Sequence, residues 1–275
     1  MAIDFTLSPE LEDLRMRVRT FVDEVIKPTE AELTDPDHIE DRAEYINALF
    51  GMRAKAQEAG IWLPHMPQEW GGMGLGHVEL AMVQAEAAKA YYGPFVFNCM
   101  APDEGNMHTL LHWATDEQKE KYLRPLCEGI AMSCFAMTEP EVAGSDPTLI
   151  RTTAVQDGDE WVINGHKWFI SNARRAKFAI LVCRTEDNPD LPQAANSAFL
   201  VDIPSDGWNR VREVETMHGG TGHSEIVIED LRIPAENMLG GRGQGHMLGQ
   251  YRLGPARLAH CMRWISQAET ALDMM

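Results

Sequence analysis

The sequence is poor in positive charge. Of its 275 residues, 24 are lysine or arginine and 42 are aspartate or glutamate, so the formal net charge is −18. Nucleic acids and anionic membranes are bound by clustered positive charge, and this balance argues against both as partners. A small anionic ligand is still compatible with it, because a few arginines and local backbone dipoles are enough to hold one.

Paired cysteines and long apolar runs are missing as well. The five cysteines are odd in number and none are spaced as C-x-x-C, which indicates reduced thiols rather than a disulfide scaffold or a zinc site. Residues 1–14 are acidic and have no apolar core, unlike a signal or transit peptide. No run approaches the ~20 apolar residues of a membrane span. These absences predict a cytoplasmic protein.

Residues 1–130 have the pattern of helices. Ser8 and Pro9 mark a helix start, as an N-cap followed by proline at the first helical position. Apolar residues then recur at steps of three and four, which places them on one stripe: Leu11, Leu14, Val18, Phe21 and Val25. Thr115 and Gln118 form a capping box that opens a later helix. The further helices are predicted over residues 42–59, 77–91, 106–113 and 115–127.

Two patterns in this helical region are weak ligand signals. The glycine-rich segment 67–76 lacks the G-x-G-x-x-G spacing and follows no strand, so a structural loop is the better interpretation. His108 and His112 have metal-ligand spacing, but the glutamate of H-E-x-x-H is absent and no third ligand is evident. No metal site is predicted.

The pattern changes at Ala131, where short runs of β-forming residues begin. They are predicted at residues 149–155, 161–163, 166–171, 178–184, 198–203, 210–215 and 224–233. Many short strands at close spacing indicate a barrel or a sandwich. From Gly245 a helical pattern returns, with an apolar stripe that runs to Met275 without a cap. A helix this apolar needs a partner, so we expect the chain to be cut within or just after the first helix of a C-terminal bundle.

The predicted fold class is therefore α+β. It consists of an all-α N-terminal domain (1–130), a middle β-barrel or sandwich domain (131–241) and the start of a truncated C-terminal helical bundle (242–275).

The strand-rich part contains two local signals. Asn164–Gly165 is a strong hairpin signal and predicts a turn between two strands. Because side chains in a strand alternate, Phe169 and Ser171 should share one face, and Trp168 and Ile170 the other. A ring and a hydroxyl two residues apart could flank a flat heteroaromatic cofactor, although packing within the sheet is an equally ordinary role for such residues.

The loop before these strands carries small and polar residues. Glu139 precedes a proline and should be extended, Gly144 allows unusual backbone angles, and Ser145 favours a turn. The loop could present N–H groups and the hydroxyls of Thr138 and Ser145 to an electron-rich ligand. An ordinary surface loop explains the same residue types.

Four spaced segments resemble the signature of the acyl-CoA dehydrogenase family, flavoenzymes that desaturate fatty acyl thioesters in fatty acid β-oxidation. They are residues 137–140, 143–146, 164–167 and 169–172. The resemblance extends over essentially the whole chain. The segment that leads to Ser145 is one residue longer than in many members, and in this it resembles the subgroup that in animals can be fused to a kinase-like domain.

The resemblance implies a flavin oxidoreductase acting on CH–CH bonds, with FAD as cofactor. The implied FAD contacts are Phe135, Met137, Thr138, Ser145, Phe169 and Ser171. The implied substrate contacts are Ser145, Gly254 and Arg257. Phe169 stands where many members have tryptophan and Ser171 where many have threonine, so a ring and a hydroxyl are kept. The implied partners are an acyl-CoA substrate and an electron-transfer flavoprotein, in a homodimer or homotetramer.

The base that removes the α-proton has no counterpart in this sequence. The resemblance places it on a later helix in most members, and just before the arginine of segment 253–257 in a minority. That second position is Ala256 here, which cannot accept a proton. No catalytic residue is therefore assigned, and the chain alone is expected to have little dehydrogenase activity. The alternatives are a non-catalytic acyl-CoA-binding or assembly subunit, and a flavin oxidase or monooxygenase of the same fold.

Overall fold

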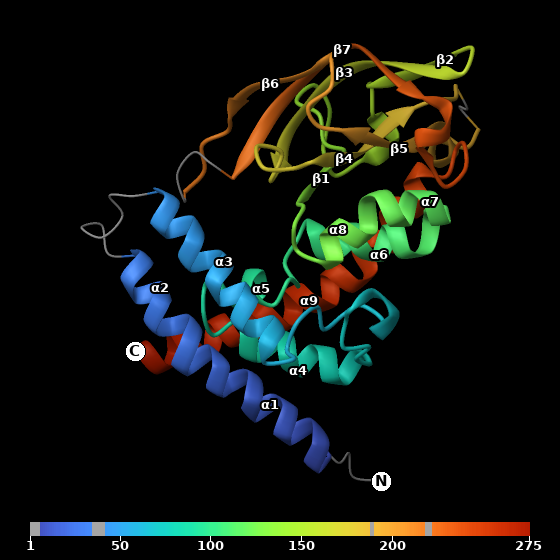
Figure 1. Ribbon diagram of the computed structural model, residues 1–275. Coiled ribbons are helices and arrows are strands. Elements are labelled where there is room, and N and C mark those ends of the chain that lie inside the picture. The colour runs from blue at the N-terminus through green and yellow to red at the C-terminus, as the bar shows by residue number, and fades with distance from the viewer. Residues whose placement is uncertain (1–5, 35–41, 188–189, 218–221) are drawn as a thin grey trace. The chain divides into compact units, whose positions relative to one another are not determined.

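The computed structural model describes residues 6–34, 42–187, 190–217 and 222–275 (Figure 1). The packing divides the chain into two compact units, Met1–Met100 with Pro255–Met275 and Ala101–Gly254. The predicted fold class is confirmed, since helices come first, a mixed sheet follows and a helix comes last. The boundaries at residues 130 and 241 stay predictions. Within the described ranges, no helix is long and apolar enough to cross a membrane.

The first unit is helical. Its helices are α1 (Pro9–Phe21), α2 (Lys27–Thr34), α3 (Arg42–Glu58), α4 (His77–Ala87), α5 (Gly93–Val96) and the last part of α9 (Gly245–Met274). Helix α1 begins as predicted, because the Ser8 hydroxyl accepts a hydrogen bond from the Leu11 N–H at 3.2 Å. It continues into a π-helical turn, Val22–Ile26. The wider turn moves the buried stripe, so that Ile26 is buried in place of the predicted Val25.

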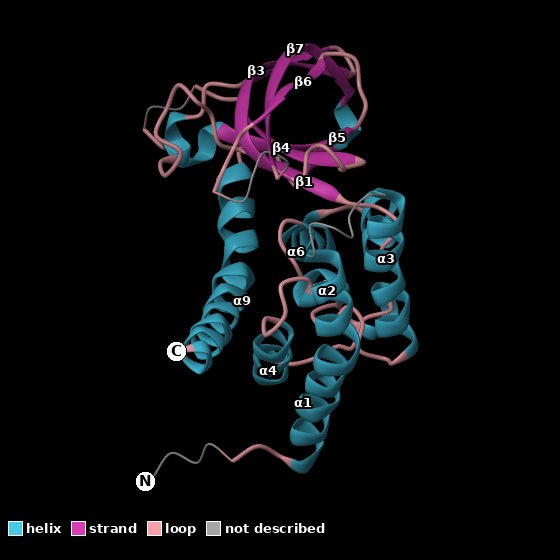
Figure 2. Ribbon diagram, turned by 90° about the vertical axis from the view of Figure 1, so that its left-hand side faces the viewer, coloured by secondary structure: helices cyan, strands magenta, loops and turns pink. Residues whose placement is uncertain are grey.

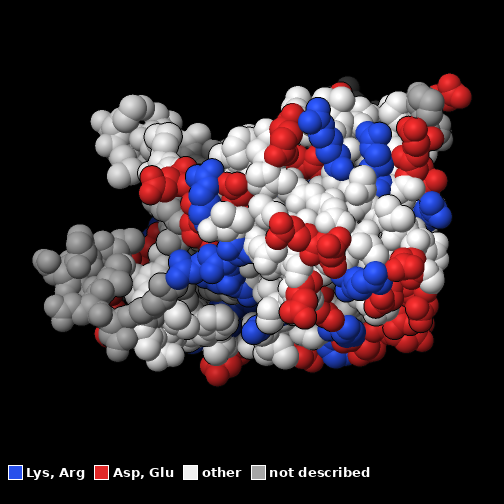
Figure 3. All heavy atoms as spheres, turned by 90° about the horizontal axis from the view of Figure 1, so that it is seen from above, with Lys and Arg blue, Asp and Glu red and all other residues white. Residues whose placement is uncertain are grey.

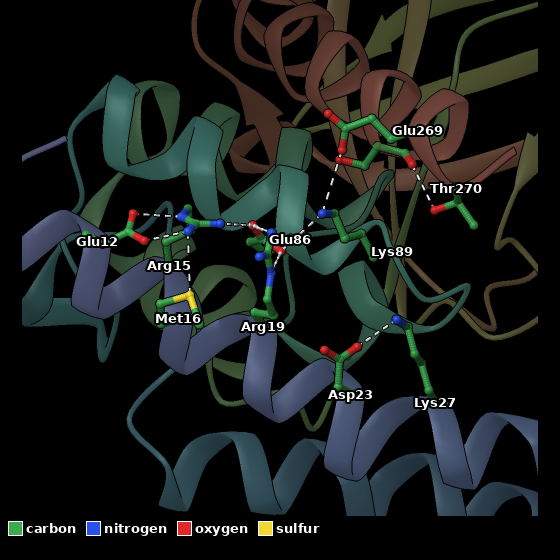
Figure 4. A network of polar contacts seen from close by, with 11 residues as sticks. Glu12, Arg15, Met16, Arg19, Asp23, Lys27, Glu86, Lys89, Glu269 and Thr270 are labelled. Carbon is green, nitrogen blue, oxygen red and sulfur yellow. Dashed lines mark hydrogen bonds and ion pairs between the residues drawn. The ribbon is translucent and has the colours of Figure 1, made fainter. Parts of the chain in front are cut away.

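A buried carboxylate holds α1 to the residues at the end of α4 (Figure 4). Glu86 accepts from Arg15 Nη1 at 3.1 Å and from Arg19 Nη2 at 2.8 Å. Lys89 Nζ lies 3.7 Å from Glu86 and 3.6 Å from Glu269 of α9. A buried charge is stable only when it is paired, so this network fixes the three helices together.

The second unit opens with short helices, α6 (Asp103–Trp113), α7 (Asp116–Gln118) and α8 (Arg124–Cys127). The predicted capping box is present. Gln118 N donates to Thr115 Oγ1 at 3.2 Å, and Thr115 N donates to Gln118 Oε1 at 3.1 Å. The amide nitrogen of Gln118 then donates to the carbonyls of Glu236 and Met238, at 2.9 and 3.0 Å.

Over its described residues, the second unit has a sheet of eight strands: β1 (Ser133–Ala136), β2 (Thr153–Asp157), β3 (Glu160–Ser171), β4 (Phe178–Arg184), β5 (Asn196–Asp202), β6 (Trp208–Glu213), β7 (His223–Pro234) and β8 (Met238–Leu239). Their order is β6-β7-β3-β2-β4-β5-β8, and β1 pairs in parallel with β4. The strands curve around a common interior (Figure 2) filled by residues such as Ile163, Leu181, Phe199 and Ile226. The strand predicted over 149–155 begins only at Thr153.

The predicted turn at Asn164–Gly165 is wrong. Strand β3 is continuous through it, and the hairpin lies earlier, where Asp157 pairs with Glu160. Asn164 instead marks a register shift against β7. Its side-chain oxygen accepts from Asp230 N at 2.8 Å, and its amide donates to the Asp230 carboxylate at 3.1 Å. A β-bulge favours the same residue types as a turn, so the dipeptide alone does not distinguish them.

We predict that Gly165→Ala destabilises the second unit. A Cβ at Gly165 would lie 2.3 Å from Thr152 Oγ1, and Thr152 is buried. Overpacking of this kind costs about 1–3 kcal/mol, so the urea midpoint followed by tryptophan fluorescence should fall. Gly51→Ala is the control, because a Cβ there meets nothing within 4 Å. An unchanged midpoint for Gly165→Ala would contradict the close packing.

Candidate functional site

A buried ion pair lies beneath the loop that follows β1. Lys167 of β3 and Glu139 of the loop have side chains that are 0% and 1% exposed, with Nζ and Oε1 2.8 Å apart. Lys167 Nζ also donates to the carbonyls of Met137 at 2.9 Å and Val182 at 2.8 Å. An ammonium group has three protons to donate, so this one is fully satisfied and links the loop to β3 and β4.

Glu139 is equally well satisfied. It accepts from Arg151 N at 2.7 Å, from Thr152 N at 2.9 Å and from Thr152 Oγ1 at 2.6 Å. Burial raises the pKa of Glu139, but the Lys167 ammonium and these donors outweigh burial and hold its pKa below the ordinary value. The carboxylate is therefore ionised, and it fixes both ends of the loop between β1 and β2.

Thr138 runs alongside β3. Its hydroxyl donates to the Trp168 carbonyl at 2.7 Å, and Trp168 N donates to the Thr138 carbonyl at 3.1 Å. The hydroxyl proton is thus engaged by the backbone, and only its oxygen lone pairs are left for a ligand. Thr138 and Phe169 were both predicted to bind a cofactor. The hydrogen bonds of Thr138 to the Trp168 backbone bring the two close together, because Phe169 is the next residue along the strand.

Phe169 occupies an unusual backbone conformation for a bulky residue. Its φ is +53°, and the residue is 44% exposed on the strand. Positive φ is an outlier for such residues and persists only where the surrounding structure imposes it. The ring lies 6.1 Å from that of His223, whose Nδ1 is 2.9 Å from the Ser171 hydroxyl. Phe169 and Ser171 therefore share one side of β3, as predicted.

The prediction that Trp168 and Ile170 share the other side is wrong. Lys167 pairs with Ile226 and Ile170 pairs with Ser224, so β3 holds one extra residue across a two-residue step of β7. This bulge puts Lys167 and Ile170 both on the buried side. Side chains do not alternate strictly here because the extra residue shifts the following side chains to the opposite face of β3. No residue type in the segment predicts the bulge.

Phe135 has a partner that the sequence analysis missed. The guanidinium of Arg252, from α9, lies 4.3 Å from the centre of the Phe135 ring. Arg252 Nε also donates to Asn106 Oδ1 at 2.8 Å. Burial lowers the pKa of Arg252 to about 10, which leaves it charged at neutral pH. Its place directly before segment 253–257 was the one available signal in the sequence.

The remaining predicted residues lie in two places. Ser145 is exposed on a turn in which Asp146 N donates to the Ala143 carbonyl at 3.0 Å. Gly254 and Arg257 are exposed on α9, where Gly254 belongs to the second unit and Arg257 to the first. The structure therefore places most of the predicted cofactor residues on the loop after β1 and on the end of β3, with Phe135 on β1 itself, all within the second unit.

A charged cavity in the helical unit and the arrangement of possible metal ligands do not indicate a further ligand site. A cavity of about 320 Å³ in the helical unit is lined by charged side chains that include Arg19 and Lys27. These cations pair with carboxylates of Glu86 and Asp23, at 2.8 and 2.6 Å, so their charge is balanced within the helices. Over the described ranges, no three His, Cys, Asp or Glu side chains are grouped to hold a metal.

The chain matches known proteins over nearly its whole length. Residues 8–130 match the acyl-CoA dehydrogenase N-terminal domain and residues 134–231 its middle domain. FadE2 of Mycobacterium tuberculosis, named as a probable acyl-CoA dehydrogenase, is 36% identical over 99% of this chain and 68% of its own. A solved structure from Mycobacterium abscessus, described as an acyl-CoA dehydrogenase, is 37% identical with a TM-score of 0.90, over 98% of this chain and 69% of its own.

The helical and sheet units with this loop are those of a flavoenzyme fold. This chain belongs to the acyl-CoA dehydrogenase family. It is also 35% identical to acyl-CoA dehydrogenase family member 11 of Gallus gallus over 98% of this chain, and there it spans 36% of the relative's length.

We predict that breaking the buried pair destabilises the second unit strongly. Lys167→Met leaves Glu139 buried without its cation, which costs about 3–5 kcal/mol in comparable pairs. The double variant Lys167→Met with Glu139→Leu should recover part of the loss. Lys121→Met is the control, because Lys121 forms a half-exposed pair with Asp202 at 2.9 Å, where about 1 kcal/mol or less is expected.

The same pair predicts the direction of acid sensitivity. The pKa of Glu139 is lower in the folded protein than in the unfolded chain. The stability it contributes is therefore present above the unfolded pKa and is lost as the pH falls through the folded pKa. Urea midpoints measured down the acid range should fall less steeply for the double variant than for the wild type; parallel curves would contradict this.

Proposed function

We propose that the second unit binds FAD on the loop after β1 and the end of β3, as part of an acyl-CoA dehydrogenase. The observation that carries this proposal is the exposed Phe169 ring, held outward by a left-handed backbone beside the Ser171 hydroxyl. A ring can pack on the face of a flat heteroaromatic cofactor, and a hydroxyl can form a hydrogen bond with its edge. The residues present therefore fit a flavin.

A bound flavin would supply the redox chemistry, and the protein would bind and orient it. Phe169 offers an apolar surface, and Ser171 offers a hydroxyl that His223 orients. Thr138 offers lone pairs because its proton is already donated to Trp168. Lys167 and Glu139 keep this part of the loop in place from below. Each contribution is a positioning one and involves no proton transfer by these groups.

The proposed substrate is a fatty acyl-CoA thioester. Ser145 and Arg257 are the exposed groups proposed to contact it, with Gly254 permitting close approach. On the face drawn in Figure 3, basic side chains stand in small groups among acidic ones. Such a mixed surface is unsuited to a nucleic-acid strand, which is bound by clustered positive charge. An electron-transfer flavoprotein is the proposed electron acceptor, and a dimer or tetramer is the proposed assembly.

The first experiment measures binding of FAD by visible absorption and by quenching of tryptophan fluorescence. Phe169→Ala should weaken binding about tenfold, which corresponds to ~1.4 kcal/mol of lost stacking. Phe169→Trp should preserve it, because a ring is kept. Val155→Ala is the matched control, since Val155 is an exposed apolar residue on β2. Equal affinities for all four proteins would contradict the assignment of Phe169.

A second candidate function follows from Ala256, which stands at one of the family's two base positions and cannot accept a proton. It favours a chain that binds acyl-CoA without oxidising it. The measurement is the flavin absorbance after anaerobic addition of a long-chain acyl-CoA. Binding without bleaching is the expected outcome for residues 1–275 alone. Bleaching at ordinary enzyme rates would mean that a base is present within them, and would overturn the expected inactivity.

A further inference from the structure

His166 lies between two carboxylates. Its Nδ1 is 2.7 Å from Glu141 Oε1, and its Nε2 is 2.9 Å from Glu225 Oε1. Glu141 belongs to the loop that carries Ser145, His166 to the middle of β3 and Glu225 to β7. The second oxygen of Glu225 accepts from Arg212 of β6 at 2.6 Å. A chain of charged groups thus runs from the loop across three strands.

This chain lies on the opposite side of β3 from the buried pair. Lys167, the next residue, points into the core and binds Glu139, whereas His166 is partly exposed on the outer side. The loop is therefore fastened twice, through Glu139 from the inside and through Glu141 from the outside. The inner attachment is dry, but the outer one is open to solvent and can respond to pH.

Both outer contacts require an imidazolium. A neutral imidazole has one N–H to donate, and the doubly protonated ring has two. Carboxylates only accept when ionised, so the geometry with a glutamate on each nitrogen is satisfied only by the charged ring. Arg212, the remaining charged group in this row of contacts, donates its hydrogen bond to Glu225 and not to the imidazole ring.

The electrostatics agree with the geometry. Burial lowers the pKa of His166, but hydrogen bonds and charge from Glu141 and Glu225 outweigh burial, and the net pKa is raised above the ordinary value of 6.5. The hydrogen bond from His166 is the largest cause of a lowered pKa at Glu225. The doubly bonded imidazolium therefore persists to higher pH than a free histidine would.

We propose that His166 is a positioning residue for the loop between β1 and β2. As an imidazolium it links Glu141 to Glu225, and loss of its proton releases the segment of this loop that presents Ser145. This link is called the tie below. This inference rests on the proposed function of the loop. The link through His166 makes the order of the loop, and the affinity for FAD or acyl-CoA, depend on pH.

The sign follows from the raised pKa. A group whose pKa is higher in the folded protein contributes its full stabilisation below the unfolded value, and the contribution is lost as the pH rises through the folded value. The loop is therefore held at pH values below the pKa of His166 in the folded protein and is released above it. If His166 did not hold the loop, the order of the loop would not depend on the titration of His166.

The experiment measures the tie without any ligand first. Imidazole titration by NMR gives the pKa of His166, and hydrogen exchange with mass spectrometry gives the protection of residues 141–146, corrected for the intrinsic rate. In the wild type, protection should fall as the pH rises through the pKa of His166. Glu141→Gln should lower that pKa, and His166→Gln should make protection low and independent of pH. His166→Arg, which keeps its charge, should preserve protection to higher pH.

The FAD dissociation constant is then measured over the same pH range. The wild type should weaken about five- to tenfold as His166 loses its proton, whereas His166→Gln should show a constant, weaker affinity. His77→Gln is the control, since His77 is an exposed histidine on α4. A His166 pKa at or below 6.5, or protection of residues 141–146 that ignores pH, would overturn the tie.

The two proposals fail in different ways. If protection follows His166 but the FAD and acyl-CoA affinities do not, the positioning role is overturned and the tie is merely structural. If the wild type binds neither ligand at any pH, the proposed function fails, and the exchange and NMR results still decide whether the tie exists.

Discussion

The structure of the candidate site depends on one buried charge pair. Lys167 and Glu139 are out of contact with water, and every proton and most lone pairs of the two groups are used within the fold. A buried ion pair adds little net stability over apolar packing, but losing one partner is costly. Its consequence here is geometric, because it fixes where the loop after β1 meets β3, and Gly165 leaves the room that Thr152 needs beside Glu139.

Next to this buried pair, strand β3 is irregular, with a bulge between Lys167 and Ile170. The bulge at Phe169 costs hydrogen bonding and places a bulky residue at positive φ. Such a conformation persists because Lys167 before the bulge and Ile170 after it are both buried and anchor the strand. The result is an exposed aromatic ring near the Ser171–His223 pair, carried by a strand rather than by a loop.

Local signals in the sequence predicted local structure well. Ser8 with Pro9, and Thr115 with Gln118, encode helix starts whose hydrogen bonds span three residues. Asn164 was misread because its partner, Asp230, is 66 residues away. The bulge at Phe169 and the contact of Arg252 with Phe135 were unpredictable for the same reason. The family motifs supplied the candidate residues, but only the pairing of distant strands shows how they are held.

The Gln118 side chain joins a local contact to a distant one. Its carbonyl oxygen completes a helix start with Thr115, three residues away. Its amide nitrogen closes a loop of 118 to 120 residues onto the carbonyls of Glu236 and Met238. Thr115 N–H needs an acceptor, and the carbonyls of Glu236 and Met238 need a donor. A glutamate side chain would supply only the acceptor. Two segments far apart in the sequence therefore both favour an amide at position 118.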